Sequence, residues 1–523
     1  MPILQNQDKI DDLTSKIKDL DEEIHRLMTQ RARYRCRLND LQAETRVLPP
    51  ETLSIIFHYC NRSRKRLLSL GAVCSHWRDV AWSTPSLWTK CHLIFPWGCV
   101  LCWQAEALRL WFSNCPPCGL SLHLHFNGRE ENTEELYHRF EDDPLPDYVP
   151  DDDGIARLVL DGNHHKLRAL KFNYLPMVWR TRFVSCLLSG KLSNLRALDI
   201  AQLTLSREER IKSENINFLT RLTLHSNHEL LDSFPSEQLT SLEIRQVDSR
   251  SAFNLLLQLP QLRSFTCERE DLWELDPNPD LSQHEDIILP NLLELEWDFR
   301  DDPWSMVLLE HIRLPALKHL YWNAGLWSST HHRRHLASLA REFFPCLPHL
   351  ETFKSDADYI WMSDTNSAPF TFLAEGLREL SLLHAEDTAL LSHHFQYIVH
   401  CLTVPLDQSE ARRTTFPSLE KLVIGIDSFI FQVHSGSYVN SLLQIVQSRR
   451  RECQAEGARR SQLQVIRFSV VSAAEWAVLN SSFYDFQDSF REIEHGGVFV
   501  EVEKGNGDIT SWSDFTPAIW GNI

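Results

Sequence analysis

The chain has 523 residues, of which 43% are hydrophobic, and its 53 Lys and Arg against 71 Asp and Glu give a net charge of -18. This hydrophobic content is enough for a large core, and the length predicts roughly two to four domains. The acidic excess argues against a general attraction to nucleic acid or to an anionic membrane, and it favours a partner with a basic surface.

The N-terminus and the cysteines indicate the compartment. Residues 1–12 lack the charged-then-apolar pattern of a signal peptide, and no later apolar run approaches the ~20 residues that span a bilayer. Thirteen cysteines, an odd number spread along a long chain, favour reduced thiols over a disulfide framework. We therefore expect a soluble protein of the cytoplasm, the nucleus or both, with no membrane partner and no nucleic-acid partner.

Residues 8–46 have the pattern of a coiled-coil helix. Their core positions recur at alternating steps of three and four residues, which gives a helical stripe with a 3.5-residue period. The stripe consists of Ile10, Leu13, Ile17, Leu20, Ile24, Leu27, Arg31, Tyr34, Leu38 and Leu41, with Arg31 as its one charged member. Lys16 and Asp21 flank it with opposite charges. The pattern predicts a homodimer through this helix; a single amphipathic helix folded back on the chain's own domain is the alternative.

Residues 47–93 predict a small helical domain. Pro49 and Pro50 lack a backbone N–H and disfavour helix in the residue before them, so the first helix must end here. A new helix can begin at once, because proline is tolerated in the first turn and Glu51 suits the positive helix end. Two further segments, 64–82 and 84–88, complete a unit of three short helices. A unit this small buries little surface, so a stable partner interface makes physical sense.

The sequence "LPPETLSIIFHYC…LLSLGAVCSHWRDVAWSTPSLW" resembles the F-box domain, although Thr52 departs from its usual pattern. The matching residues are Leu48, Pro49, Leu53, Ile56, Phe57, Leu70, Val73, Cys74, Trp77, Arg78, Pro85, Leu87 and Trp88. The resemblance implies docking on the Skp adaptor, which joins F-box proteins to a cullin scaffold, a RING subunit and a ubiquitin-conjugating enzyme. The adaptor-binding residues that it implies, some of them shared with the domain core, are Leu48, Pro49, Leu53, Ile56, Phe57, Val73, Cys74 and Trp77.

Residues 94–165 predict a helical and strand region with an acidic loop. The pairs Cys99/Cys102 and Cys115/Cys118 have the spacing of zinc ligands, but the helical segment between them is about 18 Å long. We therefore expect buried or turn cysteines, with structural zinc as the alternative. Residues 119–126 alternate as the first strand of a sheet. The acidic, proline-bearing stretch 130–153 predicts a solvated loop, with a contact site for a basic partner as the alternative.

Residues 166–470 repeat the phrase Leu-x-x-Leu-x-Leu or close variants of it. The phrases begin at Leu167, Leu195, Leu219, Leu239, Leu262, Leu292, Leu317, Leu350, Leu377, Leu419 and Leu463. Each reads as a short strand that cannot bury its apolar face alone, so stacked repeats are expected. The array resembles leucine-rich repeats, but the Asn that usually follows the strand is matched clearly only at Asn227, and insertions or an unrecognised repeat are expected between 383 and 463. Residues 471–523 predict a cap made of a helix, a glycine turn and an edge strand.

In such a solenoid, one residue of each phrase points out of a concave surface. These residues are Lys171, Asp199, Thr223, Glu243, Thr266, Glu296, Tyr321, Lys354, Ser381, Val423 and Arg467. No single chemistry repeats among them, which excludes a repetitive polymer as ligand and favours one protein surface or a degron. The substrate-binding candidates are Glu243, Thr266, Glu296, Tyr321 and Lys354.

The chain contains no phosphate-binding glycine loop, no Gly-x-Ser-x-Gly and no His-Glu-x-x-His motif. We therefore predict a non-catalytic subunit without metal or cofactor. The predicted fold class is α/β: a coiled-coil helix, a small three-helix F-box, then an irregular leucine-rich-repeat solenoid. The predicted function is substrate recognition in an SCF-type (cullin-RING) ubiquitin ligase; the alternative is a non-ligase repeat scaffold whose F-box-like module mediates protein–protein interaction only.

Overall fold

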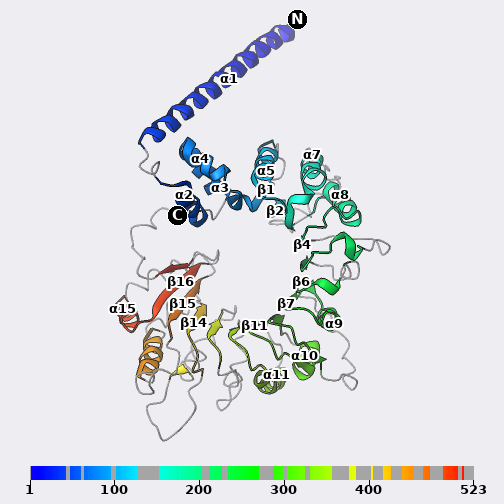
Figure 1. Cartoon of the computed structure of the whole chain (residues 1–523), viewed down its shortest axis with the longest axis vertical. Coiled ribbons are helices and arrows are strands. Elements are labelled where there is room, and N and C mark those ends of the chain that lie inside the picture. The colour runs from blue at the N-terminus through cyan, green and yellow to red at the C-terminus, as the bar shows by residue number, and fades with distance from the viewer. Residues whose placement is uncertain are drawn as a thin grey trace. The chain divides into compact units, whose positions relative to one another are not determined.

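The computed structural model describes residues 2–42, 48–60, 64–95, 102–126, 152–173, 175–201, 211–225, 234, 236–269, 287–299, 303–323, 330–355, 376–383, 402–403, 416–425, 439–451, 463–470, 487–504 and 509–511. The chain divides into two compact units, Met1–Leu219 and Thr220–Ile523, a boundary that falls inside the predicted repeat array. Both units combine helices with parallel strands, so the predicted α/β class is confirmed (Figure 1).

The first unit begins with a long helix, α1 (Pro2–Gln42), which extends further toward the N-terminus than predicted. Three shorter helices follow: α2 (Pro50–Cys60), α3 (Arg64–Val73) and α4 (Ser75–Trp82). Segment 64–82 was expected to be continuous, but it breaks at Cys74. The Cys74 sulfur accepts the Trp77 N–H at 3.4 Å and so caps α4. A 3₁₀ turn, η2 (Pro85–Trp88), completes this set.

Trp88 joins these helices to the elements that follow. Its indole N–H donates to the Ala81 carbonyl at 2.8 Å, and its ring meets those of Trp82 and Trp111 edge-on, with centroids 5.1 Å and 4.8 Å away. Trp111 belongs to α5 (Cys102–Asn114), and its indole N–H donates to the Lys90 carbonyl at 3.0 Å. A chain of three buried or half-buried indoles therefore connects the helical domain to the sheet.

Among the described residues of the first unit, four parallel strands form a sheet in sequence order. They are β1 (Lys90–Phe95), β2 (Leu120–Phe126), β3 (Leu167–Phe172) and β4 (Ala197–Ala201). The prediction that the strand at 119–126 comes first was wrong, since β1 precedes it. Cys91, Leu93 and Phe95 alternate with exposed residues in β1, and a neighbouring strand is needed to cover that apolar row.

Helices and turns of the first unit cover the apolar side of its strands. They are α7 (Asp152–Ala156), the π-helical turn η4 (Arg157–Gly162), η5 (His164–Lys166), α8 (Met177–Leu188) and η6 (Ser213–Asn215). Phe172 of β3 packs edge-on against Trp179 and Phe183 of α8. Strand β3 is thus held on its buried face by aromatic contacts from the helix that follows it.

In its described residues the second unit has the same pattern, with ten parallel strands and one antiparallel strand. They are β5 (Arg221–His225), β6 (Ser241–Val247), β7 (Ser264–Arg269), β9 (Glu294–Asp298), β11 (His319–Asn323), β12 (Thr352–Ser355), β13 (Glu379–Leu382), β14 (Lys421–Gly425), β15 (Val465–Val470), β16 (Phe499–Lys504) and the antiparallel β17 (Ile509–Ser511). A separate pair joins β8 (Ile287–Ile288) to β10 (Ile312–Arg313). Every predicted leucine phrase contributes a strand of this ladder or of the first sheet: the phrases correspond to β3 to β7, β9 and β11 to β15.

Helices cover the apolar face of the second sheet (Figure 1). They are α9 (Ser249–Gln258), α10 (Pro303–His311), α11 (Thr330–Phe343), a helix at 439–451 and α15 (Gln487–His495), with short turns η8 (Ser236–Gln238) and η10 (Phe344–Cys346). Asp248 caps α9 by accepting the Ser251 N–H at 2.7 Å, and Phe253 and Leu256 of that helix are buried. The opposite face of the sheet carries a mostly polar set of side chains, among them Glu243, Thr266 and Glu296.

The C-terminal cap has the predicted helix, α15, and the predicted glycine turn, in which Gly497 has φ +83°. The strand that follows, β16, was predicted to be an edge strand, but β17 pairs with it. None of the described helices combines the length and the apolar character that a bilayer crossing requires.

Substitution of one leucine of the parallel ladder should destabilise the second unit. Leu222 of β5 is fully buried, and Leu222→Ala is expected to lower the free energy of unfolding by about 2–5 kcal/mol through lost contacts and a cavity. The neighbouring exposed Arg221→Ala is the control and should change it by less than about 0.5 kcal/mol. Urea unfolding measures both; equal effects would contradict the burial pattern.

Candidate functional site

Helix α2 has one buried and one exposed apolar side. Leu53 and Phe57 have no exposed surface, and the Phe57 ring lies 5.1 Å from that of Trp77 in α4. These contacts fix α2 against the rest of the helical domain. The opposite side exposes Ile55 at 58% and Tyr59 at 81%, and Ile56 at 37% lies beside them. A helix side this apolar and this exposed has the chemistry of a protein-docking surface.

The eight predicted adaptor-binding residues fall into three groups in this structure. Pro49 and Ile56 are exposed; Leu48, Val73 and Trp77 are half-buried; Leu53, Phe57 and Cys74 are buried. The buried three hold the domain together, so the accessible candidates are the other five. The adaptor-binding role of these residues stays a prediction.

Two exposed residues were missed in the sequence, Ile55 and Tyr59. Their signal was the helical period itself: once Leu53 and Phe57, four residues apart, form the buried side, Ile55 and Tyr59 must lie away from it. Glu51, also exposed, lies one turn before Ile55 on the same side. The exposed side of α2 is therefore apolar with an acidic residue at its N-terminal end.

A second candidate surface crosses the strands of the second unit. The five predicted substrate-binding residues lie at one register position on adjacent strands: Glu243 pairs with Thr266, Thr266 with Glu296, Glu296 with Tyr321 and Tyr321 with Lys354. We call this set the cross-strand row. With strands about 4.8 Å apart, it is about 19 Å long. The parallel register brings together residues that are up to 111 positions apart in sequence.

The row continues on both sides in the same unit. Thr223 precedes Glu243, and Ser381, Val423 and Arg467 follow Lys354 at the matching position of β13, β14 and β15. Thr223, Ser381 and Val423 are buried, so the expectation that they point out of the surface was wrong. Arg467 is held by Glu501 of β16 at 2.7 Å and by Glu503 at 3.2 Å. The guanidinium of Arg467 is therefore paired with carboxylates of the neighbouring strand in the same sheet.

The first half of the cross-strand row is acidic. The Thr266 hydroxyl donates to the Glu296 carboxylate at 3.4 Å, and Arg245 contacts Glu243 at 2.6 Å and Glu268 at 3.4 Å. Burial raises the pKa of the Glu296 carboxyl above its usual value, and the nearby charges of Glu243 and Glu268 raise it as well, while the Thr266 hydrogen bond and the charge of Lys354 oppose the shift. A cationic side chain placed beside Glu296 would remove that repulsion, so this half of the row suits a basic group.

The second half of the row changes character. Tyr321 is half-buried and Lys354 is exposed, so an aromatic surface and a cation follow the two glutamates. Along the row, the side chains are in turn an acid, a hydroxyl, an acid, an aromatic ring and a base, so the chemistry differs between every two neighbouring strands. Such a surface can distinguish a protein segment by its pattern of charges.

The first unit has its own row at the same register position: His92, His123, Lys171 and Asp199. Lys171 pairs with Asp199 at 2.6 Å, and the rings of His92 and His123 stack with centroids 4.2 Å apart. Burial lowers the pKa of His123 to about 4, and His92, Lys171 and His125 lower it as well, while Asp199 opposes them. The stacked pair was not predicted, because His92 lies in β1, which was not recognised as a strand in the sequence, and His123 in the predicted strand was not singled out.

The cysteine pairs do not assemble among the described residues. Cys115 is buried, Cys118 lies in an exposed turn at φ +52°, Cys99 lies outside the described residues and the Cys102 side chain is not described. Helix α5 occupies the spacer, as predicted. No group of three or more His, Cys, Asp or Glu side chains suited to a metal ion occurs in the part of the chain that the structure describes. The acidic stretch 130–153 lies almost wholly outside that part.

Comparison with known proteins identifies the helical domain. Residues 45–94 match the F-box-like family. The chain therefore contains an F-box-like domain, within two residues of the predicted 47–93. No curated protein matches the chain in a sequence comparison. F-box-like domains generally mediate protein–protein interaction, which agrees with the exposed apolar side of α2.

The stacked histidines predict a pH dependence of stability in the first unit. The pKa of His123 is about 4 in the folded chain and about 6.5 when unfolded, so the unfolded state binds more protons between these values. Stability is therefore greatest above pH 6.5 and falls as the pH drops toward 4. From pH 7 to 5.5 the loss due to His123 is about 1 kcal/mol. His123→Gln should reduce this loss in urea unfolding, whereas Ser121→Ala, on the same face of β2, should retain it.

Proposed function

We propose that this protein is the substrate-recognition subunit of an SCF-type, cullin-RING ubiquitin ligase. The observation that carries the proposal is an F-box-like domain with an exposed apolar helix side, followed by a long parallel ladder whose cross-strand row, from Glu243 to Lys354, is half-buried to exposed. The domain docks on the Skp adaptor, and the repeats, a leucine-rich-repeat solenoid of irregular form, bind a protein substrate. The complex acts in the cytoplasm, the nucleus or both.

In this proposal the chain performs no bond chemistry. The ubiquitin-conjugating enzyme of the complex transfers ubiquitin, and this chain holds the substrate near it, so its contribution is proximity and orientation. Three indoles in contact, Trp82, Trp88 and Trp111, support this role, because they join the F-box-like helices to the first sheet without a free linker.

The adaptor interface is proposed at the accessible residues of the helical domain. Pro49, Ile55, Ile56 and Tyr59 are exposed, and Leu48 lies beside them half-buried. Burying two or three large apolar side chains against a partner stabilises a complex by about 1.5–3 kcal/mol each. The buried residues Leu53 and Phe57 act indirectly by fixing the direction of α2.

The substrate surface is proposed at the cross-strand row. About 19 Å of row matches about six residues of an extended peptide at 3.3 Å each. A basic residue of the substrate would meet Glu243 and Glu296, an apolar or aromatic residue Tyr321, and an acidic residue Lys354. Partial burial of Glu296 and its raised pKa support the first contact, because a cation there offsets an unfavourable charge.

Adaptor binding should depend on exposed residues of the helical domain. Pro49→Ala/Ile56→Asp places a carboxylate on the apolar side of α2 without changing its buried side, so the fold should be retained. We expect at least about a ten-fold weaker complex with a Skp adaptor after co-expression, measured by calorimetry. The exposed Asp79→Asn in α4 is the matched control and should bind normally. A folded wild-type chain that does not bind the adaptor would refute the ligase assignment.

Substrate ubiquitylation should depend on both surfaces. Proteins whose ubiquitylation increases with wild type in cells, but not with Pro49→Ala/Ile56→Asp, are the candidate substrates. For these, Glu296→Gln/Lys354→Ala should reduce ubiquitylation about five- to ten-fold, as expected when central contacts are lost, with adaptor binding unchanged. Glu342→Gln/Lys318→Ala, which alters exposed charges outside the row, is the control. A different result would indicate the scaffold function instead. In that case proteins would bind through the cross-strand row, but the ubiquitylation of none of them would depend on the adaptor-binding residues.

A further inference from the structure

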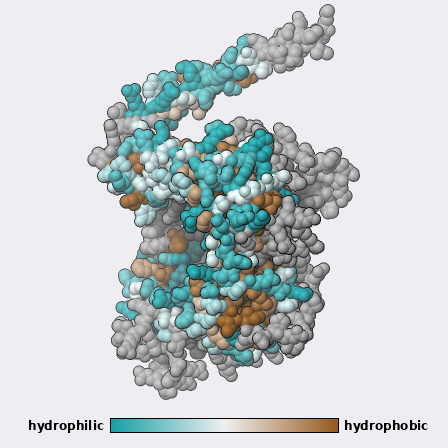
Figure 2. Space-filling model, turned by 45° about the vertical axis from the view of Figure 1, so that its right-hand side comes forward, coloured by the Kyte–Doolittle hydropathy of each residue, from teal (hydrophilic) through white to brown (hydrophobic). Residues whose placement is uncertain are grey.

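Helix α1 carries an apolar stripe, interrupted at Arg31, whose described side chains the chain itself leaves largely exposed. In the described part of the stripe, the large apolar side chains are between 49% and 62% exposed. They are Leu13 at 58%, Ile17 at 59%, Leu20 at 62%, Ile24 at 53%, Leu27 at 49%, Tyr34 at 62% and Leu38 at 51%. Brown hydrophobic patches on the otherwise mostly teal α1 are visible in Figure 2. Seven such side chains along one side of one helix predict a partner.

The spacing of the stripe restricts what that partner can be. From Ile10 to Leu41 its members follow steps of three and four without a break, over a length of about 46 Å. Apolar residues with a 3.5-residue period form a narrow seam, which stays in contact along its length only with another helix that supercoils around it. A helix that lies on a globular core needs a wider apolar face. The occupant of the stripe is therefore a helix of similar length and period.

The order of the core side chains in α1 favours a pair of parallel helices. Isoleucine occupies the first core position and leucine the second in three successive heptads: Ile10 and Leu13, Ile17 and Leu20, Ile24 and Leu27. β-branched residues at the first position with leucine at the second select a parallel dimer over trimers and tetramers. We propose that α1 pairs, parallel and in register, with α1 of a second copy of this chain, so that the protein is a homodimer.

Flanking charges fit a second copy in that arrangement. In a parallel in-register pair, the residue before a first core position faces the residue five positions later in the other helix. Lys16 thus faces Asp21 of the second copy, and symmetry repeats the contact. Glu23, the next such position, is bound within its own helix by Arg26 at 2.6 Å and faces the uncharged Met28. No like charges meet at these positions in the described helix.

Arg31 interrupts the apolar core at one layer. A shallow groove on α1 is lined by Leu27, Gln30, Arg31, Tyr34, Arg35 and Leu38, which are all core or flanking positions. Its walls have the composition of the hole that receives a core side chain of a second helix. The long stem of Arg31 can cover the core while its guanidinium reaches water, and a polar layer of this kind limits alternative registers at some cost in stability.

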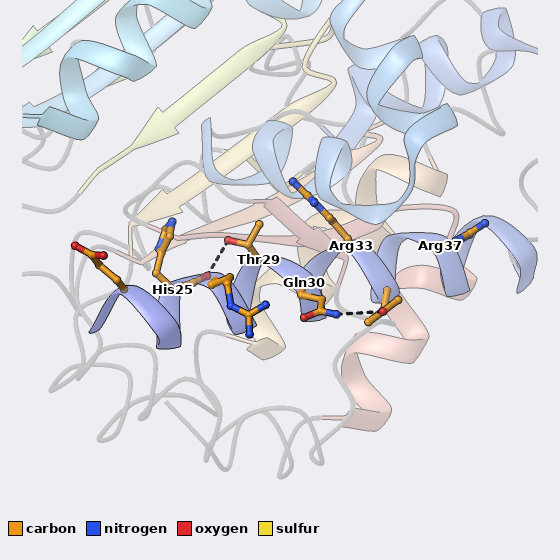
Figure 3. A pocket seen from close by; sticks show the side chains of 8 residues that line it. His25, Thr29, Gln30, Arg33 and Arg37 are labelled. Carbon is orange, nitrogen blue, oxygen red and sulfur yellow. Dashed lines mark hydrogen bonds between the residues drawn. The ribbon is translucent and has the colours of Figure 1, made fainter. Parts of the chain in front are cut away.

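The outer side of the helix needs no partner. On that side Figure 3 shows Thr29, whose hydroxyl donates to the His25 carbonyl at 2.8 Å. Gln30, at the flank of the stripe, donates its amide to the hydroxyl of Tyr34, a member of the stripe, at 3.2 Å. Arg33 and Arg37 extend from the same helix in that view. Since these polar groups are satisfied within α1 or accessible to water, the apolar stripe remains the surface that association would cover.

Light scattering on the full chain tests the pairing. Wild type should elute at twice the 60.9 kDa of the single chain. Ile17→Asn/Ile24→Asn places four amides in the seam of the dimer and should weaken dimerisation at least about a hundred-fold. Lys18→Asn/His25→Asn makes the same replacement one residue further along, outside the seam, and should remain dimeric. This control separates loss of the interface from loss of helix propensity.

A charge exchange tests the orientation. Lys16→Glu alone and Asp21→Lys alone each bring like charges together and should weaken the dimer about three- to ten-fold. When the two variants are mixed, the glutamate introduced in one chain meets the lysine introduced in the other, and the native Lys16 and Asp21 also meet. Mixed dimers should therefore form in preference to either homodimer. Differently tagged chains, co-purified and quantified, measure this preference.

Three results would overturn the proposal. A monomeric wild type at micromolar concentration would mean that the stripe folds on its own chain or awaits a different helix. A dimer that survives Ile17→Asn/Ile24→Asn would place the interface elsewhere. Random mixing of the charge variants would exclude the parallel register. The inference does not depend on adaptor or substrate binding, which these measurements leave unchanged.

Discussion

The fold depends on one constraint: a short strand with a leucine row on one face cannot bury that row by itself. A neighbouring strand with the same row solves this, and the parallel ladder from β5 to β16 extends the solution over ten strands in sequence order. Because the leucines must line up, the residue between them also lines up. Glu243, Thr266, Glu296, Tyr321 and Lys354 thereby form one row, although each comes from a separate repeat. The polar surface is a consequence of how the apolar one is buried.

The helical domain meets the same difficulty at a smaller scale. About 45 residues must provide both their own core and a docking surface, and α2 divides these tasks between its two sides. Leu53 and Phe57 are committed to the core, while Ile55 and Tyr59 are left exposed. Trp88 then fixes the domain to the elements behind it through Trp82 and Trp111. In the proposed function this connection keeps the F-box-like helices joined to the first sheet without a flexible linker.

Pairing through α1 would double both surfaces. Two F-box-like domains and two cross-strand rows in one particle raise the effective concentration of the second binding event, which strengthens binding to a substrate that carries two recognition segments. The arrangement requires little of the rest of the chain, because the stripe and the flanking charges lie within one helix. It also explains why α1 exposes so many large apolar side chains in the single chain.

The sequence by itself determined what depends on local periodicity. The 3.5-residue stripe of α1, the end of that helix before Pro49, the F-box-like domain and the strand in every leucine phrase follow from patterns within a few turns or one strand. Tertiary structure decided what depends on distant contacts. It buried Leu53, Phe57 and Cys74 and exposed Ile55 and Tyr59, added β1 before the expected first strand, and stacked His92 on His123. It also committed Arg467 to Glu501 and Glu503. Burial and pairing of this kind depend on residues far apart in the chain. The helical period of α2 places Ile55 and Tyr59 opposite Leu53 and Phe57, but only the tertiary contacts decide which of the two sides is buried.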